Sequence, residues 1–179
     1  SNYQLIKQGK VRDIYQDESN LDTLVFLHSD RLSSFDKHIC MVNGKGNILC
    51  RTTAWWFNQT SHIIPNHMIT ARDNYILAKA CEVIPIEFVV RGYITGSTST
   101  SLWTHYNKGV RNYCGIDFPE GLVKNQKLSA PVLTPTTKDE HDEPLSCQDI
   151  VTRGVLSQED LDYISGKAMV AHVWEKAIL

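Results

Sequence analysis

Basic residues are not in excess in this sequence. Its 179 residues include 18 Lys and Arg against 20 Asp and Glu, a formal net charge of -2 at pH 7. A protein that follows the phosphates of a nucleic acid needs a basic surface. We therefore expect no nucleic-acid partner, and we expect any anion site to be local.

Long apolar runs and clustered cysteines are also missing. No apolar run approaches the roughly 20 residues that span a bilayer, and no basic leader precedes an apolar signal segment. The cysteines, 5 in number, lie far apart, with neither a CxxC pair nor the histidine spacing of a zinc site. The sequence therefore predicts free thiols, no metal-ligating residues, no membrane partner and a cytoplasmic location.

Strand patterns come first along the chain. Val11–Tyr15 follows Gly9-Lys10, and Leu21–His28 ends at a polar cluster, which predicts an antiparallel start. A helix of about three turns is expected over Arg51–Ile64, ended by Pro65. Its adjacent tryptophans, at 55 and 56, point about 100° apart, so one should pack inward and the other lie at an edge.

The segment Ile84–Ser97, IPIEFVVRGYITGS, runs from an apolar strand into an arginine, glycines and hydroxyls. The apolar run predicts a strand covered on both faces, and Glu87 inside it should have a partner or face a cleft. Arg91 can hold two phosphate oxygens with its planar fork, Gly96 lets the backbone approach a ligand, and Ser97 can donate. The alternative is an ordinary structural turn.

The rest of the chain predicts a loop and a helix. Asn107–Gln148 is broken by glycines and prolines, which favours a long ordered loop or a pair of short strands. Ser157 can cap a helix that runs to the end of the chain. Its apolar face is expected to hold Leu161, Ile164, Ala168, Ala171 and Ile178, with Trp174 beside it.

Two charged motifs lie near the start. GKVRDIY, Gly9–Tyr15, can lay backbone amides and two cations against a polyphosphate, although a hairpin with solvated basic residues is the alternative. SDRLSSFD, Ser29–Asp36, gathers charges and hydroxyls that suit a sugar phosphate. Its alternative is a turn that caps a short helix.

A third motif, PTTKDEHDEPLS, spans Pro135–Ser146. Lys138 can attract an α-carboxylate, Asp142 can attract an ammonium group, and His141 can change protonation near neutral pH. A solvated acidic loop is the alternative.

Taken together and in this order, the four segments resemble the SAICAR synthetase family of purine biosynthesis. The family's first signature is an apolar pair, Pro, an apolar residue and Glu, followed by Arg, three residues, Thr or Ala, Gly and Ser. Val83–Ser97 fits it, and the other three motifs also match the family pattern. The resemblance covers essentially the whole chain.

The resemblance implies a ligase that uses ATP and Mg²⁺ to join L-aspartate to the carboxylate of carboxyaminoimidazole ribonucleotide (CAIR), through an acyl phosphate. It implies an α+β fold: a kinase-like or ATP-grasp-like antiparallel lobe over residues 1–82 that holds the nucleotide, and a partial second lobe over 83–179 with substrate loops and a terminal helix.

The resemblance also implies residue roles. ATP would be bound by Gly9, Lys10, Val11 and Arg12, with Glu87 lining the nucleotide cleft. The substrate CAIR would be held by Arg91, Gly96 and Ser97 at its phosphate, and by Asp30, Arg31, Ser33 and Asp36 around its imidazole and ribose. The reacting carboxylate and the incoming aspartate would lie near Lys138, His141 and Asp142.

Family members continue beyond this point with a second signature, Asp-x-Lys-x-Glu-Phe-Gly, which this sequence lacks. We therefore expect a truncated and catalytically inactive or impaired chain. The rival interpretation is a non-catalytic module that binds nucleotides or sugar phosphates. A protein-kinase-like phosphotransferase is disfavoured because its catalytic-loop and DFG-type residues are missing.

Overall fold

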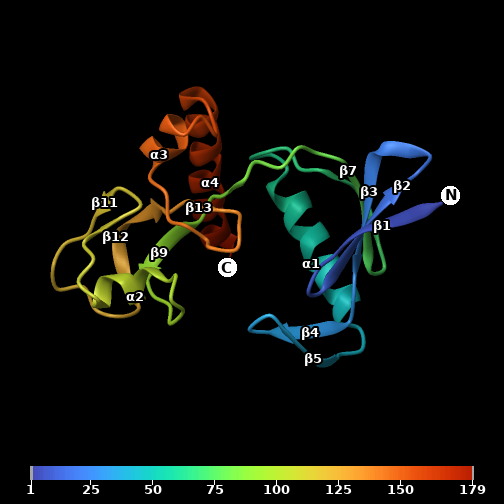
Figure 1. Cartoon of the computed structure of the whole chain (residues 1–179), viewed down its shortest axis with the longest axis horizontal. Helices are drawn as coiled ribbons and strands as arrows, with labels where there is room; N and C mark the ends of the chain where they lie inside the picture. Colours follow the sequence, from blue (N-terminus) through green and yellow to red (C-terminus); the bar gives the residue numbers. More distant parts are fainter. Residues whose placement is uncertain (1, 179) are drawn as a thin grey trace. The chain divides into compact units, whose positions relative to one another are not determined.

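The structure, a computed structural model, describes residues 2–178, and among these the side chains of residues up to Val173. Contacts within the chain define two compact units, Ser1–Glu82 and Val83–Leu179 (Figure 1). The ligand that each unit holds stays a prediction.

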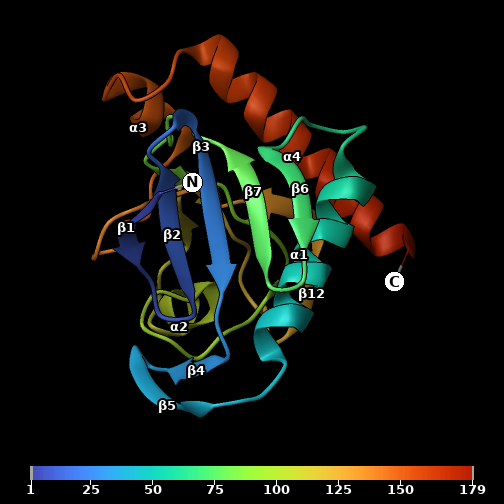
Figure 2. The same cartoon turned by 90° about the vertical axis from the view of Figure 1, so that its right-hand side faces the viewer.

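Unit 1, Ser1–Glu82, is built on an antiparallel sheet in the order β1-β2-β3-β7-β6 (Figure 2). The predicted strands are confirmed as β2 (Arg12–Asp17) and β3 (Asn20–His28). The edge strand β1 (Tyr3–Gln8) and the hairpin of β6 (Met68–Arg72) and β7 (Tyr75–Lys79) were not predicted. Every residue of β1 is exposed, so its sequence lacks the alternation that marks a half-buried strand.

Helix α1 (Lys45–Thr60) packs against β3, β6 and β7. Cys50 of the helix is buried together with Ile76 and Ala78 of the sheet. The helix begins six residues before the predicted start, at Lys45 rather than Arg51, and ends before Pro65. The tryptophans behave as predicted, since Trp55 is 47% exposed while Trp56 is half-buried, with the rings edge to face at 4.9 Å.

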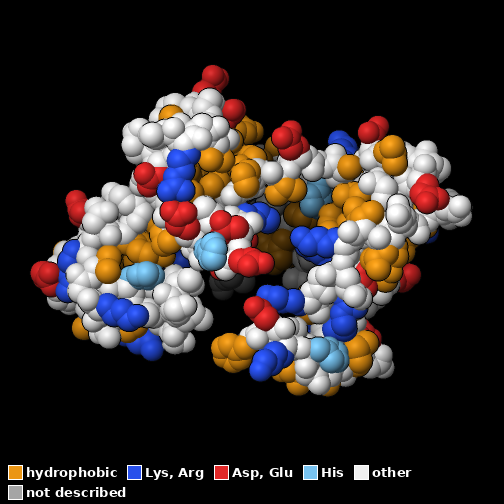
Figure 3. Space-filling view, in the orientation of Figure 1, with side chains coloured by type: hydrophobic (Ala, Val, Ile, Leu, Met, Phe, Trp, Pro, Cys, Tyr) orange, Lys and Arg blue, Asp and Glu red, His pale blue; other side chains and the backbone are white. Residues whose placement is uncertain are grey.

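A second hairpin joins the sheet to α1. Its strands are β4 (Arg31–Ser34) and β5 (Lys37–Met41), and Phe35 and Asp36 turn it with φ values of 47° and 64°. The sequence predicted only a turn over Ser29–Asp36, because the short strands carry few apolar residues. Hydrophobic, basic and histidine side chains mix on the hairpin surface (Figure 3).

Unit 2, Val83–Leu179, contains three short strand pairs rather than one long strand. The expected strand covered on both faces is wrong: Val83 is 67% exposed, Pro85 supplies no backbone N–H, and the run divides into β8 (Ile86–Glu87) and β9 (Val90–Ile94). β8 pairs with β13 (Thr136–Thr137), whereas β9 pairs with β12 (Gln126–Leu133). The third pair is β10 (Asn112–Tyr113) with β11 (Ile116–Asp117).

Over Asn107–Gln148, the expected pair of short strands is found as β10 and β11, whereas the eight-residue β12 was not predicted. Its register shifts between Lys127 and Val132, where Pro131 cannot donate to the ladder, and this irregularity hides the strand from its sequence.

Three helices complete unit 2: α2 (Leu102–Asn107), α3 (Cys147–Thr152) and α4 (Gln158–Ile178). The predicted cap of α4 is confirmed, because the Asp160 amide donates to Ser157 Oγ at 3.1 Å. Leu161 is buried, and Ile164, Ala168 and Ala171 are half-buried on the predicted face, while the side chains of Trp174 and Ile178 lie outside the described residues. Within the described residues, no helix is both long and apolar enough to cross a membrane.

Two apolar cores stabilise unit 2. One gathers around β9, α2 and β12, and the other joins β8 to α3 and the start of α4. The first is made by Ile94, Leu102, Tyr106, Tyr113, Phe118 and Leu128, and the second by Ile86, Leu145, Ile150 and Leu161. These cores fix the strand ends from which the candidate site residues of unit 2 project.

Candidate functional site

The turn between β1 and β2 carries the first predicted ligand residues, Gly9, Lys10 and Val11. The Gly9 amide donates to the Arg12 carbonyl at 2.8 Å. A Cβ atom at Gly9 would lie 2.8 Å from that same carbonyl oxygen, closer than real Cβ contacts. The tight turn therefore needs glycine at this position.

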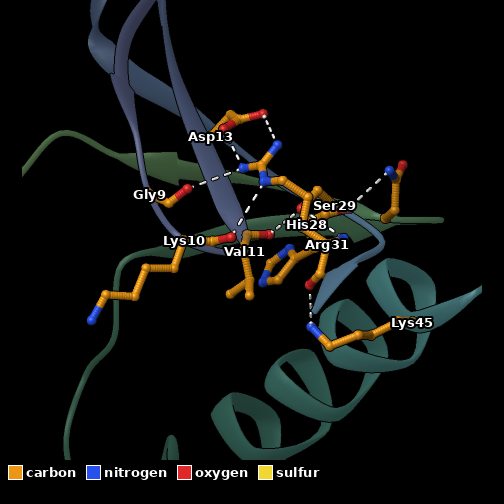
Figure 4. Close-up of polar contacts among 9 residues, drawn as sticks. Gly9, Lys10, Val11, Asp13, His28, Ser29, Arg31 and Lys45 are labelled. Carbon is orange, nitrogen blue, oxygen red and sulfur yellow. Dashed lines mark hydrogen bonds and ion pairs between the residues drawn. The ribbon is translucent and has the colours of Figure 1, made fainter. Parts of the chain in front are cut away.

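Arg31 lies against this turn from β4 (Figure 4). Its Nε donates to the Lys10 carbonyl at 3.3 Å, and its Nη2 donates to the Gly9 carbonyl at 3.1 Å. The guanidinium also pairs with both carboxylate oxygens of Asp13, at 2.6 and 3.2 Å. The hydrogen bonds that Arg31 donates to Asp13 raise the pKa of Arg31, so the cation is permanent.

Ser29 also binds the backbone of this turn. Its Oγ and its backbone amide both donate to the Val11 carbonyl, at 2.7 and 2.9 Å. The amides of Lys10 and Val11, in contrast, donate to no group among residues 2–178. Two neighbouring N–H groups are thus left to meet a ligand.

Asp30 binds the N-terminus of α1. Its carboxylate accepts from the amides of Gly44 at 3.2 Å and Gly46 at 2.8 Å. Next to them, Lys45 Nζ donates to the Arg31 carbonyl at 2.9 Å. A Cβ at Gly46 would approach the His28 carbonyl oxygen to 2.3 Å, so this crossing of helix and strand requires glycine.

A surface pocket brings together five predicted residues of unit 1. It is lined by Gln8, Gly9, Lys10, Arg31, Ser33, Asp36 and His38. Lys10 forms an ion pair with Asp36 across it, and both side chains are largely exposed. The pocket therefore presents exposed charges of both signs beside the turn.

Arg12, the fourth predicted ATP residue, lies with its guanidinium carbon 5.1 Å from the centre of the Phe26 ring. His28, on the same strand as Phe26, is 4% exposed, and its Nδ1 has no partner among the described residues. Burial and the nearby Arg12 charge lower the pKa of His28, so the ring is neutral at pH 7.

In unit 2, Arg91 projects from β9 toward the fully buried Thr134. The Arg91 Nε donates to Thr134 Oγ1 at 2.7 Å, and the Thr134 amide donates to the Val89 carbonyl at 2.8 Å. The two terminal nitrogens of Arg91 make no hydrogen bond to the described residues. They can therefore bind an anion in the bidentate manner that the sequence predicts.

Gly96 has a packing role that the sequence did not predict. Its φ is 107°, and a Cβ there would lie 2.2 Å from the Ser101 Cβ. The glycine thus makes room for a buried serine, and its role in the approach of a ligand stays a prediction. Ser97, next to it, is exposed.

Glu87 and Lys138 lie on the paired strand β8 and just after β13, with Oε1 and Nζ 4.0 Å apart. The expected partner of Glu87 is thereby found. Glu87 lies in unit 2, outside the five-stranded sheet of unit 1, and its expected role in lining the nucleotide cleft stays a prediction.

The loop after Lys138 is closed by Asp139. Its Oδ1 accepts from Thr137 Oγ1 at 2.8 Å and from the amides of His141 and Asp142 at 2.9 and 3.2 Å. These hydrogen bonds lower the pKa of Asp139. The side chains of His141 and Asp142 remain exposed, and acidic and histidine side chains gather on the surface beside β13 (Figure 3).

The predicted site residues thus form two groups. Gly9, Lys10, Val11, Arg12, Asp30, Arg31, Ser33 and Asp36 lie in unit 1, and Glu87, Arg91, Gly96, Ser97, Lys138, His141 and Asp142 lie in unit 2. Sequence reasoning missed Asp13, Ser29, Lys45 and Thr134 as partners of these residues. Asp13 and Ser29 had a signal, because they lie inside GKVRDIY and SDRLSSFD, whereas Lys45 and Thr134 lie outside the motifs.

The fold combines α-helices with an antiparallel sheet. It also offers Arg91, whose terminal nitrogens are available, and a turn whose Lys10 and Val11 amides have no acceptor among residues 2–178. These features are typical of a protein that binds phosphorylated ligands. Comparison with known proteins identifies the particular family. The sequence profile of the SAICAR synthetase family matches residues 5–177, so the chain belongs to that family.

Two relatives illustrate the match. The chain is 55% identical over 164 residues to the chloroplastic phosphoribosylaminoimidazole-succinocarboxamide synthase of Arabidopsis thaliana, covering 90% of this chain and 39% of the relative. It is 54% identical over 164 residues to the synthase of Legionella pneumophila strain Paris, covering 90% and 52%. The chain thus spans about half the length, or less, of these relatives.

Solved structures agree with this assignment. The SAICAR synthase of Saccharomyces cerevisiae complexed with SAICAR superposes with a TM-score of 0.81 at 28% identity, covering 96% of this chain and 61% of that one. The predicted mixed α/β fold with an antiparallel sheet is thereby confirmed.

Proposed function

We propose that the protein to which this chain belongs is an ATP-dependent ligase, which joins L-aspartate to the carboxylate of CAIR to give SAICAR. The observation that carries the proposal is the family match over residues 5–177. The yeast relative that carries SAICAR supports the choice of substrate.

The nucleotide is assigned to unit 1, in a lobe of kinase-like or ATP-grasp-like character. The unbonded amides of Lys10 and Val11, together with the cations Lys10 and Arg12, suit a triphosphate. Mg²⁺ enters with ATP on its phosphate oxygens. The described residues hold no cluster of three or more metal-ligating side chains, and we assign none of them to the ion.

The 5′-phosphate of CAIR is assigned to unit 2. Arg91 binds it with the two terminal nitrogens that Thr134 leaves free, and Ser97 donates to the same group. Within unit 1 taken by itself, Ser33 and Asp36 line a pocket and are assigned to contacts with an imidazole or a ribose, while Asp30 and Arg31 hold the neighbouring backbone through their hydrogen bonds.

The reaction itself needs an activated carboxylate, because a carboxylate is a poor acyl donor. Transfer of the terminal phosphoryl group of ATP to a CAIR carboxylate oxygen gives an acyl phosphate and ADP. The aspartate amine then attacks the acyl carbon, phosphate leaves, and the amine loses a proton. Cations at the site stabilise the charge that develops.

Lys138, His141 and Asp142 are assigned to the reacting carboxylate and the incoming aspartate. Lys138 can attract a carboxylate, and Glu87 holds its ammonium group at 4.0 Å. The exposed His141 and Asp142 can receive the aspartate ammonium group and its proton.

The proposal is tested by incubating the chain with CAIR, Mg-ATP and aspartate, and by titrating it with each ligand alone. Binding of CAIR and Mg-ATP supports the assigned sites, and formation of SAICAR supports the ligase activity. Binding without turnover agrees with the expected inactive or impaired chain, and it is also what the alternative predicts, a module that binds nucleotides or sugar phosphates. Binding of neither ligand contradicts the proposal.

A further inference from the structure

Side chains hold the turn Gly9–Val11 through its carbonyl groups. Three consecutive carbonyls accept hydrogen bonds, those of Gly9 and Lys10 from Arg31, and that of Val11 from Ser29 (Figure 4). A turn between two strands normally leaves such groups to water. Here two side chains from a segment about twenty residues away determine the direction of the peptide groups.

Arg31 is itself fixed on two sides. The carboxylate of Asp13 binds Nη1 and Nη2, and the side chain of Asp13 is only 10% exposed. From helix α1, Lys45 Nζ binds the Arg31 carbonyl at 2.9 Å. All three guanidinium nitrogens of Arg31 donate within the chain, so this group is committed to the protein rather than to a ligand.

Because the peptide bond is planar, the direction of each carbonyl group also sets the direction of the next amide group. In a planar trans peptide, the C=O and the N–H of the next residue point in opposite directions. The Gly9 carbonyl shares its plane with the Lys10 amide, and the Lys10 carbonyl shares its plane with the Val11 amide. By drawing both carbonyls inward, Arg31 turns both amides outward, and neither amide donates to a group among residues 2–178.

We propose that Arg31, Asp13 and Ser29 are positioning residues, which aim the Lys10 and Val11 amides at the phosphates of a bound nucleotide. The inference rests on the proposed function, which assigns the nucleotide to this turn. It gives Arg31 a role that its motif does not reveal, since an arginine beside a binding pocket is usually taken as a ligand contact.

The test compares affinities for adenosine, AMP, ADP and ATP, measured by titration of the chain at constant Mg²⁺. Arg31→Lys keeps the charge but cannot hold two carbonyls and a carboxylate at once. We expect the variant to lose roughly tenfold in affinity for ATP, as for hydrogen bonds to a charged group, with adenosine affinity unchanged. Ser29→Ala should show the same pattern to a smaller degree.

Arg111→Lys is the matched control. Arg111, in unit 2, also pairs bidentately with a carboxylate, that of Glu120, and also donates to two carbonyls, those of Tyr106 and Val110. Its replacement should leave all four affinities unchanged. Circular dichroism of each variant checks whether the fold is kept.

The outcomes separate two failures. If the unmodified chain binds ATP no more tightly than adenosine, the proposed nucleotide site fails and the inference fails with it. If the unmodified chain gains affinity with each phosphate and Arg31→Lys retains that gain, the inference alone is overturned. An equal loss for adenosine and ATP would also overturn it, because a merely structural role predicts that result.

Discussion

Two charged pairs, one from each unit, have opposite characters. In unit 1, the side chains of Arg31 and Asp13 are 22% and 10% exposed, and the pair holds a turn through several hydrogen bonds. In unit 2, the side chains of Lys138 and Glu87 are 51% and 52% exposed, with charged atoms 4.0 Å apart. A screened surface pair contributes little, whereas a paired charge that is mostly buried fixes its surroundings. Unit 1 therefore offers a fixed backbone turn, and unit 2 offers a solvated cation.

Unit 2 also contains one cation, Arg91, whose side chain is held in place by the protein. The fully buried Thr134 holds the Arg91 Nε, so only the terminal nitrogens remain for a ligand. An arginine that is positioned for a ligand can therefore be recognised by its hydrogen bonds: the protein holds one guanidinium nitrogen and leaves the other two for the ligand.

Removing the buried partner gives the largest expected effect. Asp13→Ala leaves the Arg31 guanidinium without its carboxylate, and we expect a loss of about 3 kcal/mol in the free energy of unfolding. Urea unfolding followed by circular dichroism measures it. Glu120→Ala, which removes the exposed partner of Arg111, serves as the control and should hardly move the midpoint. Equal shifts for both variants would remove the distinction between buried and exposed pairs.

The next largest effect on stability is expected from a substitution at Gly46, where α1 crosses the end of β3. Gly46→Ala puts a Cβ where the His28 carbonyl oxygen lies 2.3 Å away, and we expect a destabilisation of about 1–3 kcal/mol from overpacking. Gly166→Ala in α4 is the control, since nothing lies within 4 Å of its Cβ position. Alanine there should stabilise by about 0.5–1 kcal/mol, because alanine favours a helix. A neutral Gly46→Ala would show that the strand and helix can separate freely.

Arg91→Lys tests the prepared cation of unit 2. One ammonium group cannot bond Thr134 and still offer two parallel donors, so CAIR should bind roughly tenfold more weakly. Titration with CAIR measures this, with adenosine affinity as the internal reference. Unchanged CAIR affinity would remove Arg91 from the site.

The pH dependence of stability gives a smaller effect. The pKa of His28 and that of His67 are lowered by burial and by the Arg12 charge, so the unfolded chain binds more protons than the folded one at mildly acidic pH. The contribution of these histidines to the free energy of unfolding should therefore be fully present above the unfolded histidine pKa of about 6.5. It should fall as the pH drops below that value.

Urea midpoints at several pH values check this expectation, and His28→Gln with His67→Gln should flatten the change. A wild-type midpoint that rises on acidification from neutral pH would show that the sign of these pKa shifts is wrong.

The sequence identified the site motifs more accurately than the elements that carry them. GKVRDIY and SDRLSSFD contribute most residues of one pocket, as expected of ligand motifs. What the sequence could not predict is that the Arg31 guanidinium donates to the carbonyls of Gly9 and Lys10 and to Asp13. These contacts join residues about twenty positions apart through the sheet, and no local pattern encodes them.

The strand around Glu87 was predicted wrongly for a related reason. Its apolar run suggested burial on both faces, but β8 is short, and its partner β13 lies about fifty residues further along the chain. Long-range contact also explains why Thr134 went unnoticed, because its hydrogen bond to Arg91 joins residues 43 positions apart in the sequence. Local caps, such as Ser157 on α4, were predictable because their partners lie within one turn.

The central claim is that this chain carries prepared sites for a nucleotide and for a sugar phosphate. Isothermal titration of the chain with Mg-ATP, and separately with CAIR, tests it most directly. We predict saturable binding of both ligands, with ATP bound more tightly than adenosine and CAIR binding weakened by Arg91→Lys. Binding of neither ligand by a folded chain would contradict the account.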